Sequence, residues 1–157
     1  MKAISLWQPW ATLMAIGAKT IETRGRPTQY RGPLAIHAAK RLTRDEIGLC
    51  HEQPFATALR TAGYLTVRQL PLGALVCVCE LVDCIQIPEG TPAQGKLFGD
   101  GILVRGVKLP PDGDELYYGN YAPGRYAWII RDLRKLADPV AWSGKQWLFD
   151  VPDEVLR

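Results

Sequence analysis

The apolar stretch from residue 73 to residue 87 constrains the fold of this chain more than any other feature of its sequence. It contains the run LVCVCELVDCIQI, whose β-branched residues favour a strand over a helix. Glu80, Asp83 and Gln86 interrupt strict alternation of polar and apolar side chains. Such interruptions are typical of a bulge or bend, which lets a sheet curl. We therefore expect a strongly curved sheet built around this strand.

Local signals divide the rest of the chain into short elements. Pro9 suits the first turn of a helix, and apolar side chains follow at helical spacing until Gly17. Thr43 and Glu46 form a capping box, which predicts that a second helix starts there. The remaining helices are expected at 54–63 and 146–149. Strands are expected at 1–6, 19–24, 34–38, 102–109, 126–131 and 133–141, and loops at 25–33, 88–101, 110–114 and 117–125.

Length and composition indicate a single globular unit. A chain of 157 residues, 47% of them hydrophobic, is long enough for one buried core and short for two. We expect one domain over residues 1–157, with an α+β fold in which curved strands form a small barrel. The chain has no charged-then-apolar leader pattern and no apolar run of the ~18 to 20 residues that cross a bilayer. These absences predict a cytoplasmic protein without a membrane partner.

The cysteines are expected to be reduced thiols in the core. Cys50, Cys77, Cys79 and Cys84 lie in mostly hydrophobic surroundings, and nothing in the sequence indicates secretion. A zinc site is the alternative, but it usually needs paired C-x-x-C or H-x-x-x-H spacing. Cys77 and Cys79 are two apart, and His51 is distant from them in sequence. We therefore expect no metal and no cofactor.

The distribution of charge is more informative than its total of +3. Between residues 19 and 44, the only acid is Glu22. The basic residues of this sector are Lys19, Arg24, Arg26, Arg31, Lys40, Arg41 and Arg44. Clustered lysine and arginine side chains attract phosphates and release their counterions, so the sector predicts a polyanionic partner. A solvated basic face is the alternative interpretation.

Three motifs stand in this part of the chain: Gln8-Pro9-Trp10, then Gly17-x-Lys19-Thr20-x-Glu22-x-Arg24, then Tyr30-Arg31-Gly32-Pro33-Leu34-x-Ile36-His37-Ala38. Together they resemble the ASCH family, the activating-signal-cointegrator homology domain. The resemblance continues through Leu72-Gly73-Ala74 and Glu80-Leu81 to Gly124-Arg125-Tyr126-Ala127-Trp128, and so covers nearly the whole chain. It implies a PUA-like fold, a curled β-barrel of about five to seven strands with helices at its openings.

The resemblance also implies recognition of RNA or a modified nucleotide in a basic cleft beside the first helix. In this binding hypothesis, the residues expected to contact phosphates or to line the cleft are Lys19, Thr20, Arg24, Tyr30, Arg31, Lys40 and Arg125. Trp7, Gln8 and Trp10 are expected to contact the base. Aromatic rings stack on bases, and a side-chain amide can form hydrogen bonds with a base edge.

A hydrolase is the alternative. For RNA cleavage, His37 or Glu22 would take the 2′-hydroxyl proton and Lys19 would stabilise the phosphorane charge. One branch of the family hydrolyses N4-acetylcytidine with the motif lysine and a threonine three positions later. Here Glu22 holds that position, and Thr20 and Thr23 are displaced from it. Structural roles stay open for both residues. Glu22 could form an ion pair with Arg24, and His37 could be a hydrogen-bonded residue of the core. The oligomeric state is not predicted.

Overall fold

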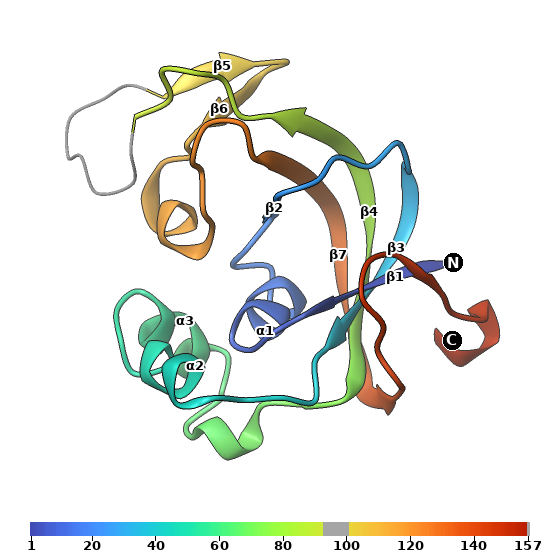
Figure 1. The fold of residues 1–157 in the computed structure, drawn as a ribbon. Coiled ribbons are helices and arrows are strands. Elements are labelled where there is room, and N and C mark those ends of the chain that lie inside the picture. The colour runs from blue at the N-terminus through green and yellow to red at the C-terminus, as the bar shows by residue number, and fades with distance from the viewer. Residues whose placement is uncertain (93–100, 157) are drawn as a thin grey trace. The chain divides into compact units, whose positions relative to one another are not determined.

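The computed structural model describes residues 1–92 and 101–156 and shows a mixed α+β fold (Figure 1). The strands are β1 (Lys2–Leu6), β2 (Ile21–Arg24), β3 (Gly32–Ala38), β4 (Ala74–Gln86), β5 (Ile102–Val104), β6 (Val107–Leu109), β7 (Tyr126–Ala141) and β8 (Phe149–Asp150). The α-helices are α1 (Trp10–Ala15), α2 (Arg44–Leu49) and α3 (Phe55–Thr61). Short 3-10 helices are η1 (Val67–Gln69), η2 (Gly113–Tyr118) and η3 (Asp153–Leu156).

Six strands form one sheet in the order β2-β7-β4-β3-β1-β8, and β5 pairs with β6 in a separate sheet. β1 runs parallel to β3, whereas β8 pairs antiparallel with β1 and β2 antiparallel with β7. Among the described residues, the edge strands β2 and β8 do not pair with each other, so the predicted closed barrel is not formed. At the start of β2, the amides of Thr20 and Ile21 donate to the carboxylate of Glu115 instead of to another strand.

The chain divides into two compact units, and β4 and β7 supply residues to both, as does β3 through Gly32. Unit 1 consists of Met1–Lys19, Pro33–Glu80 and Asp132–Arg157. Unit 2 consists of Thr20–Gly32 and Leu81–Arg131. The single domain expected over residues 1–157 stays a prediction.

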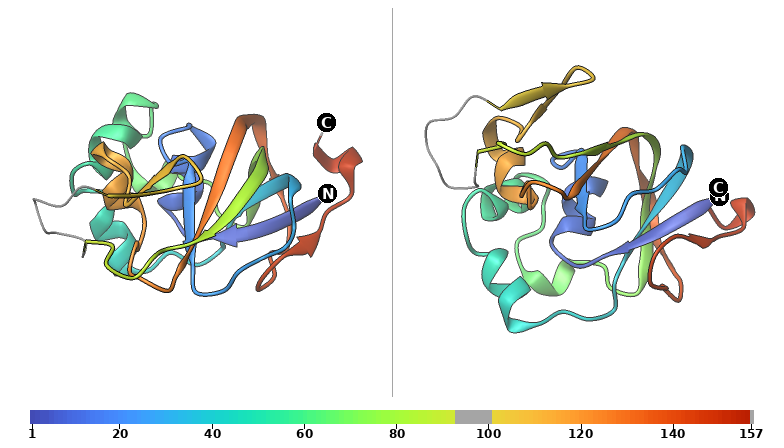
Figure 2. Two further views of the ribbon diagram at one scale, coloured as in Figure 1. Left: turned by 90° about the horizontal axis from the view of Figure 1, so that it is seen from above. Right: turned by 45° about the horizontal axis from the view of Figure 1, so that its top comes forward.

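Unit 1 is built on the parallel strands β1 and β3. The last five residues of β3 are all buried, as is typical of a strand covered on both faces. Its core includes Ala3, Ala35, Leu75, Val78, Phe149 and Val151. Helices α1 and α3 meet where Trp10 packs edge-to-face on Phe55, with ring centroids 6.4 Å apart. The start of β1 and the segment after β8 lie side by side (Figure 2), and the Met1 ammonium donates to the Val151 carbonyl at 2.8 Å.

Unit 2 has its own apolar core, formed by β2, β6, the parts of β4 and β7 that belong to this unit, and the loops that follow β4 and η2. The buried members of this core are Ile21, Ile85, Ile87, Leu109, Tyr121, Ala127 and Ile129. Val104 and Val107 pack against it from the β5–β6 hairpin. Unit 2 therefore has a hydrophobic centre separate from that of unit 1.

Most elements agree with the sequence prediction. The apolar stretch forms one strand, β4, and α1 ends before Gly17, whose φ of +76° provides the left-handed turn. The capping box is confirmed, because the Glu46 carboxylate accepts hydrogen bonds from the backbone amide and the hydroxyl of Thr43. Burial raises the pKa of Glu46, but these hydrogen bonds outweigh burial and lower it.

Four predictions of local structure differ from the structure. The single strand expected at 102–109 is a hairpin of two short antiparallel strands, β5 and β6. The strands expected at 126–131 and 133–141 are one strand, β7, which continues through Asp132 at a φ of +51°. The prediction of a helix at 146–149 is wrong, because Phe149 pairs with Ala3 as part of β8. The loops expected at 110–114 and 117–125 contain the helix η2. Of the loop expected at 88–101, residues 93–100 lie outside the described residues.

Candidate functional site

Two loops of unit 1 meet at the edge of the sheet where β1 and β3 end. Because β1 and β3 are parallel, their carboxyl ends lie at the same edge, with Leu6 opposite Ala38. The Ala39 amide donates to the Leu6 carbonyl at 2.8 Å and ties the start of the second loop to the first. Trp7 follows β1, and Lys40 follows β3, so the topology brings an indole and a cation to one edge.

A third loop, just before β4, joins this edge. Gln8 donates through Nε2 to the Pro71 carbonyl at 2.8 Å. Lys40 packs its aliphatic stem against Gly73, where an added Cβ would lie 3.6 Å from the Lys40 Cβ. The φ of Gly73 is +61°, a left-handed conformation that favours glycine. The three loops are therefore held in place by backbone hydrogen bonds and packing.

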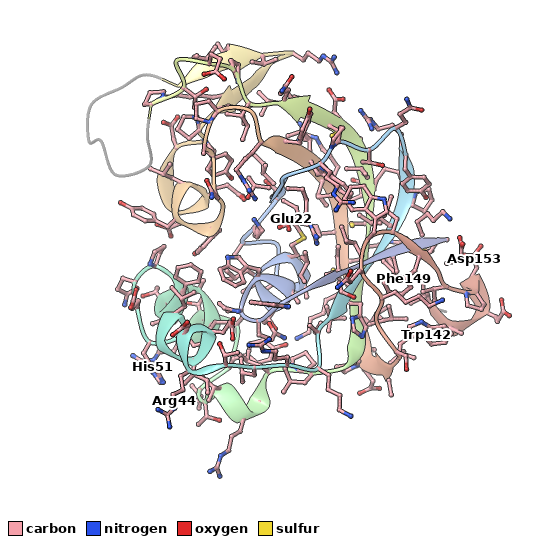
Figure 3. The ribbon with its side chains drawn as sticks, viewed as in Figure 1. Glu22, Arg44, His51, Trp142, Phe149 and Asp153 are labelled. Carbon is pink, nitrogen blue, oxygen red and sulfur yellow. The ribbon has the colours of Figure 1, made fainter. Side chains whose placement is uncertain are left out.

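The surface formed by Trp7, Lys40 and Arg41 is called the Trp7 rim below. Trp7 is 48% exposed, and the Arg41 guanidinium carbon lies 5.5 Å from the centroid of its ring. This distance is typical of a cation–π contact. Lys40 and Arg41 are exposed, and within residues 1–92 and 101–156 neither forms an ion pair. Arg44 follows at the start of α2 and points into solvent (Figure 3).

The other two residues predicted to contact a base are occupied within the protein. Gln8 is fully buried, and besides its bond to Pro71 its Oε1 accepts the Thr12 amide at 3.1 Å. Both ends of this amide therefore have protein partners. Trp10 is half-buried in its contact with Phe55. Of the two tryptophans, Trp7 is therefore the more exposed.

Among the described residues of unit 1, Lys19 is the most deeply buried cation, with 1% of its surface exposed. It follows the turn at Gly17, and its backbone amide donates to the Leu13 carbonyl at 3.1 Å. The turn that ends α1 therefore directs the motif lysine inward. A buried ammonium is costly unless polar or charged groups compensate it, so such a residue is a candidate for function.

His37 lies on β3 and is almost fully buried. Its Nε2 is 3.0 Å from the Trp142 carbonyl oxygen, which can only accept a hydrogen bond, so Nε2 carries the proton. The Ser5 hydroxyl lies 3.0 Å from the unprotonated Nδ1 and 3.1 Å from the Lys145 carbonyl oxygen, so these two acceptors share its one proton. Burial lowers the pKa of His37, although its bond to Trp142 acts to raise it. Both ring nitrogens therefore have partners inside unit 1, and the ring packs edge-to-face on Phe149.

In unit 2, the residues after Lys19 are held by Glu115 of η2. The Thr20 amide donates to Oε2 of Glu115 at 2.8 Å, and the Ile21 amide donates to Oε1 at 3.1 Å. The Thr20 hydroxyl also donates to Oε2, at 3.1 Å. One carboxylate therefore fixes the start of β2. Sequence reasoning missed Glu115, because no local pattern connects it with a segment more than ninety residues earlier.

Glu22 and Arg24 form an ion pair, with 3.0 Å between Glu22 Oε1 and Arg24 Nε. Their positions two apart on β2 place both side chains on the same face. Arg125 donates from its Nη2 to the Thr23 carbonyl at 3.3 Å and so holds the same strand. The structural role considered for Glu22, an ion pair with Arg24, is therefore confirmed.

Arg31 shares the carboxylate of Asp83 with Arg105. Arg31 Nη2 lies 3.0 Å from Asp83 Oδ1, and Arg105 Nη1 lies 3.1 Å from the same oxygen. Burial raises the pKa of Asp83, but hydrogen bonds from the Cys84 amide and both guanidinium groups lower it below its usual range. Arg31 also donates to the Tyr30 carbonyl at 2.9 Å, so most of its donors are used within unit 2.

The comparisons with known proteins identify the family. Residues 4–139 match the ASCH domain model. The chain belongs to the ASCH domain family. A crystal structure of ASCH from Zymomonas mobilis superposes with a TM-score of 0.52 at 18% identity and covers 98% of this chain and 89% of that one. A mutant of that protein gives a TM-score of 0.50 at 18% identity, with 98% and 91% covered. The search of curated proteins finds no match.

At 18% identity, these neighbours show that the overall fold is similar. The PUA-like fold implied by the family resemblance stays a prediction. Of the predicted site residues, the structure places Trp7, Gln8, Trp10, Lys19, His37 and Lys40 in unit 1. It places Thr20, Glu22, Arg24, Tyr30, Arg31 and Arg125 in unit 2. Among the described residues, no group of three or more His, Cys, Asp or Glu side chains is arranged to hold a metal ion. No helix in the described part of the domain is long and apolar enough to cross a membrane.

Proposed function

We propose that this ASCH domain binds RNA through the Trp7 rim, with Trp7 stacking on a base and Lys40 and Arg41 contacting phosphates. The observation that carries the proposal is the Arg41 guanidinium lying 5.5 Å from the centroid of the exposed Trp7 ring, next to Lys40. Stacking of a base on an aromatic side chain contributes about 1–3 kcal/mol and tolerates any sequence. Arginine and lysine beside the ring supply the positive charge that phosphates require.

The positive charges of the Trp7 rim support the proposal, because they are not compensated within the described part of the protein. Neither Lys40 nor Arg41 is neutralised by an ion pair among the described residues, whereas Arg31 already shares Asp83 with Arg105. Charge available for a phosphate is therefore greater at the rim than at Arg31. The fixed loops also reduce the conformational entropy that binding would cost.

The test is a titration of a short fluorescently labelled single-stranded RNA over a series of salt concentrations. We expect Trp7→Ala to weaken binding about tenfold, which corresponds to about 1.4 kcal/mol of lost stacking. Arg41→Ala should reduce the slope of affinity against salt by about one unit, because one phosphate contact is lost.

Trp147→Ala and Arg134→Ala are the matched controls, because both remove exposed side chains of the same types from unit 1 outside the rim. Equal effects of the rim and control variants would contradict the assignment of the rim. Absence of salt-dependent binding by the wild type would contradict RNA binding altogether.

The buried position of Lys19 supports a second candidate function, a hydrolase acting on RNA or on an acylated nucleoside. Its test is turnover of RNA oligonucleotides and N4-acetylcytidine, with products read by mass spectrometry. Activity that Lys19→Ala abolishes while the variant remains folded would support it. Absence of turnover by the wild type would leave RNA binding as the proposed function.

A further inference from the structure

We infer that two copies of this chain form a dimer by pairing one edge of β7 with the same edge of the other copy, antiparallel and centred on Leu136. The edge belongs to residues 132–141, the part of β7 that lies in unit 1, and is called the open edge below. Pairing of β7 with β2 ends at Ile130, whose amide donates to the Thr20 carbonyl at 2.9 Å. In the described part of the chain, β4 is the only strand that pairs with β7 beyond that residue. A strand with one open edge is a template for pairing with another chain.

The backbone groups of β7 alternate between the side of β4 and the open edge. The Trp142 amide donates at 3.0 Å to the carbonyl of Gly73, the residue before β4. By alternation from Trp142, the amides and carbonyls of Lys135 and Ala137 point to the open edge, and both residues are exposed. Pro139 falls on the same side, where its missing N–H removes no hydrogen bond to β4. The open edge therefore offers backbone donors and acceptors to a second strand.

The charges beside the open edge complement those of a second copy. Arg134 precedes Leu136 by two residues, and Asp138 follows it by two, so pairing centred on Leu136 sets Arg134 of each copy opposite Asp138 of the other. The two-fold symmetry produces this pair twice. Within residues 1–92 and 101–156 of one copy, neither Arg134 nor Asp138 forms an ion pair. Leu136, which packs against the core of unit 1, meets its counterpart at the symmetry axis.

The same charges disfavour other registers. Charged side chains and proline usually protect an edge strand from pairing, and they do so here in every register but one. Moving the centre to Lys135 would set the lysines of the two copies against each other. Moving it to Ala137 would set Arg134 opposite Val140 and leave its charge unmatched. In the register centred on Leu136, Lys135 lies opposite Ala137, and its ammonium contacts the Tyr64 ring of its own copy.

The dimer should be weak and reversible. Only one strand edge from each copy is in contact, which is less than the standard interface of about 1,600 Å². We therefore expect a dissociation constant in the micromolar range or above. At the low protein concentrations of an RNA titration the chain should be monomeric, so Arg134→Ala remains a valid control there.

The test is sedimentation equilibrium of the full chain over a concentration series up to the millimolar range. The wild type should show a reversible equilibrium between monomer and dimer. Asp138→Arg and Arg134→Asp each set like charges opposite each other at two places, so each variant alone should associate about tenfold more weakly or less. An equimolar mixture of the two variants should associate as tightly as the wild type, because every cross-strand pair again has opposite charges. Glu154→Arg is the matched control, because it makes the same change of charge at an exposed residue of unit 1 outside β7.

Hydrogen exchange of the wild type locates the contact. The amides of Lys135 and Ala137 should exchange more slowly as protein concentration rises, whereas the Leu136 amide, on the side of β4, should not change.

Three results would overturn the inference: a wild type that stays monomeric at every concentration, equal association of Asp138→Arg and Glu154→Arg, or a mixture of the two charge variants that associates no more tightly than either alone. The first would leave the open edge to a strand of a different protein, and the second would mean that another surface joins the copies. Because Trp7→Ala and Arg41→Ala leave the open edge intact, they should associate like the wild type. Failure of RNA binding at the rim and failure of dimer formation are thus separate results.

Discussion

Unit 1 and unit 2 use polar side chains in different ways. In unit 1, Gln8 and His37 are buried and bond mainly to backbone groups of distant segments. In unit 2, the carboxylates of Glu115 and Asp83 are only partly buried and hold backbone amides and arginines. Polar groups buried in unit 1 should therefore act through packing and desolvation, whereas those of unit 2 should respond to salt and pH. The difference shows that one small chain can stabilise its two halves by separate means.

The largest expected effect concerns the apolar core of unit 2, where Tyr121 is 1% exposed. Tyr121→Ala should lower the free energy of unfolding by about 3–5 kcal/mol, because it leaves a large cavity. The hydroxyl bond to the Glu115 carbonyl is long, at 3.4 Å. Tyr121→Phe should therefore cost less than about 1 kcal/mol. Urea denaturation measures both variants, and a similar cost for Phe and Ala would show that the hydroxyl, rather than the ring, supports this core.

In unit 1, the close approach of Gly144 to His37 and Ser5 predicts the next effect. A Cβ at Gly144 would lie 2.5 Å from His37 Nδ1 and 2.6 Å from Ser5 Oγ. Gly144→Ala should destabilise the chain by about 1–3 kcal/mol through overpacking. Gly48→Ala is the matched control, because nothing lies within 4 Å of that position in α2. It should stabilise the chain by about 0.5–1 kcal/mol. Thermal unfolding that ranks the two variants the other way would refute this view of unit 1.

Glu115→Ala should destabilise unit 2 by about 2 kcal/mol, since it removes a charged acceptor from two amides and a hydroxyl. Hydrogen exchange of the Thr20 and Ile21 amides should accelerate more than that of β3 amides. Glu89→Ala, an exposed glutamate of the same unit, should change the stability by less than about 0.5 kcal/mol. Unchanged exchange at Thr20 in Glu115→Ala would contradict the role of this carboxylate.

The smallest expected effect is the pH dependence contributed by Asp83. Because its pKa is lowered in the fold, its stabilisation is present above the pKa of the unfolded chain and is lost as pH falls through the lowered value. Asp83→Asn should remove up to about 1 kcal/mol at neutral pH and low salt, and less at high salt. Denaturation of both proteins from neutral to acidic pH measures this. Curves that stay equally far apart down to strong acid would show that Asp83 does not titrate as expected.

Part of the candidate site could be predicted from the sequence. Trp7 and Lys40 were expected to contact RNA, and both lie in the Trp7 rim, although their contact with RNA stays a prediction. Arg41 was expected only as a member of the basic sector, because nothing local to it indicates a stacked tryptophan more than thirty residues earlier. Gln8 was expected at a base edge, but the fold gives it partners at Thr12 and Pro71.

The sequence by itself determined what depends on neighbours along the chain. The capping box at Thr43, the turn at Gly17 and the apolar strand β4 follow from residues a few positions apart. The family is likewise indicated by motifs with fixed spacing. These features are local because backbone dihedral preferences and side-chain periodicity act over a few residues.

Only the tertiary structure decided the partners of polar side chains. His37 bonds to the carbonyl of Trp142, and Glu115 bonds to the amide of Thr20, each across about a hundred residues. The same applies to β8, where pairing with β1 overrides the expected helix. Such contacts satisfy groups that burial would otherwise leave unpaired, and which group is nearest depends on the path of the whole chain. No spacing within the sequence specifies that path at these positions.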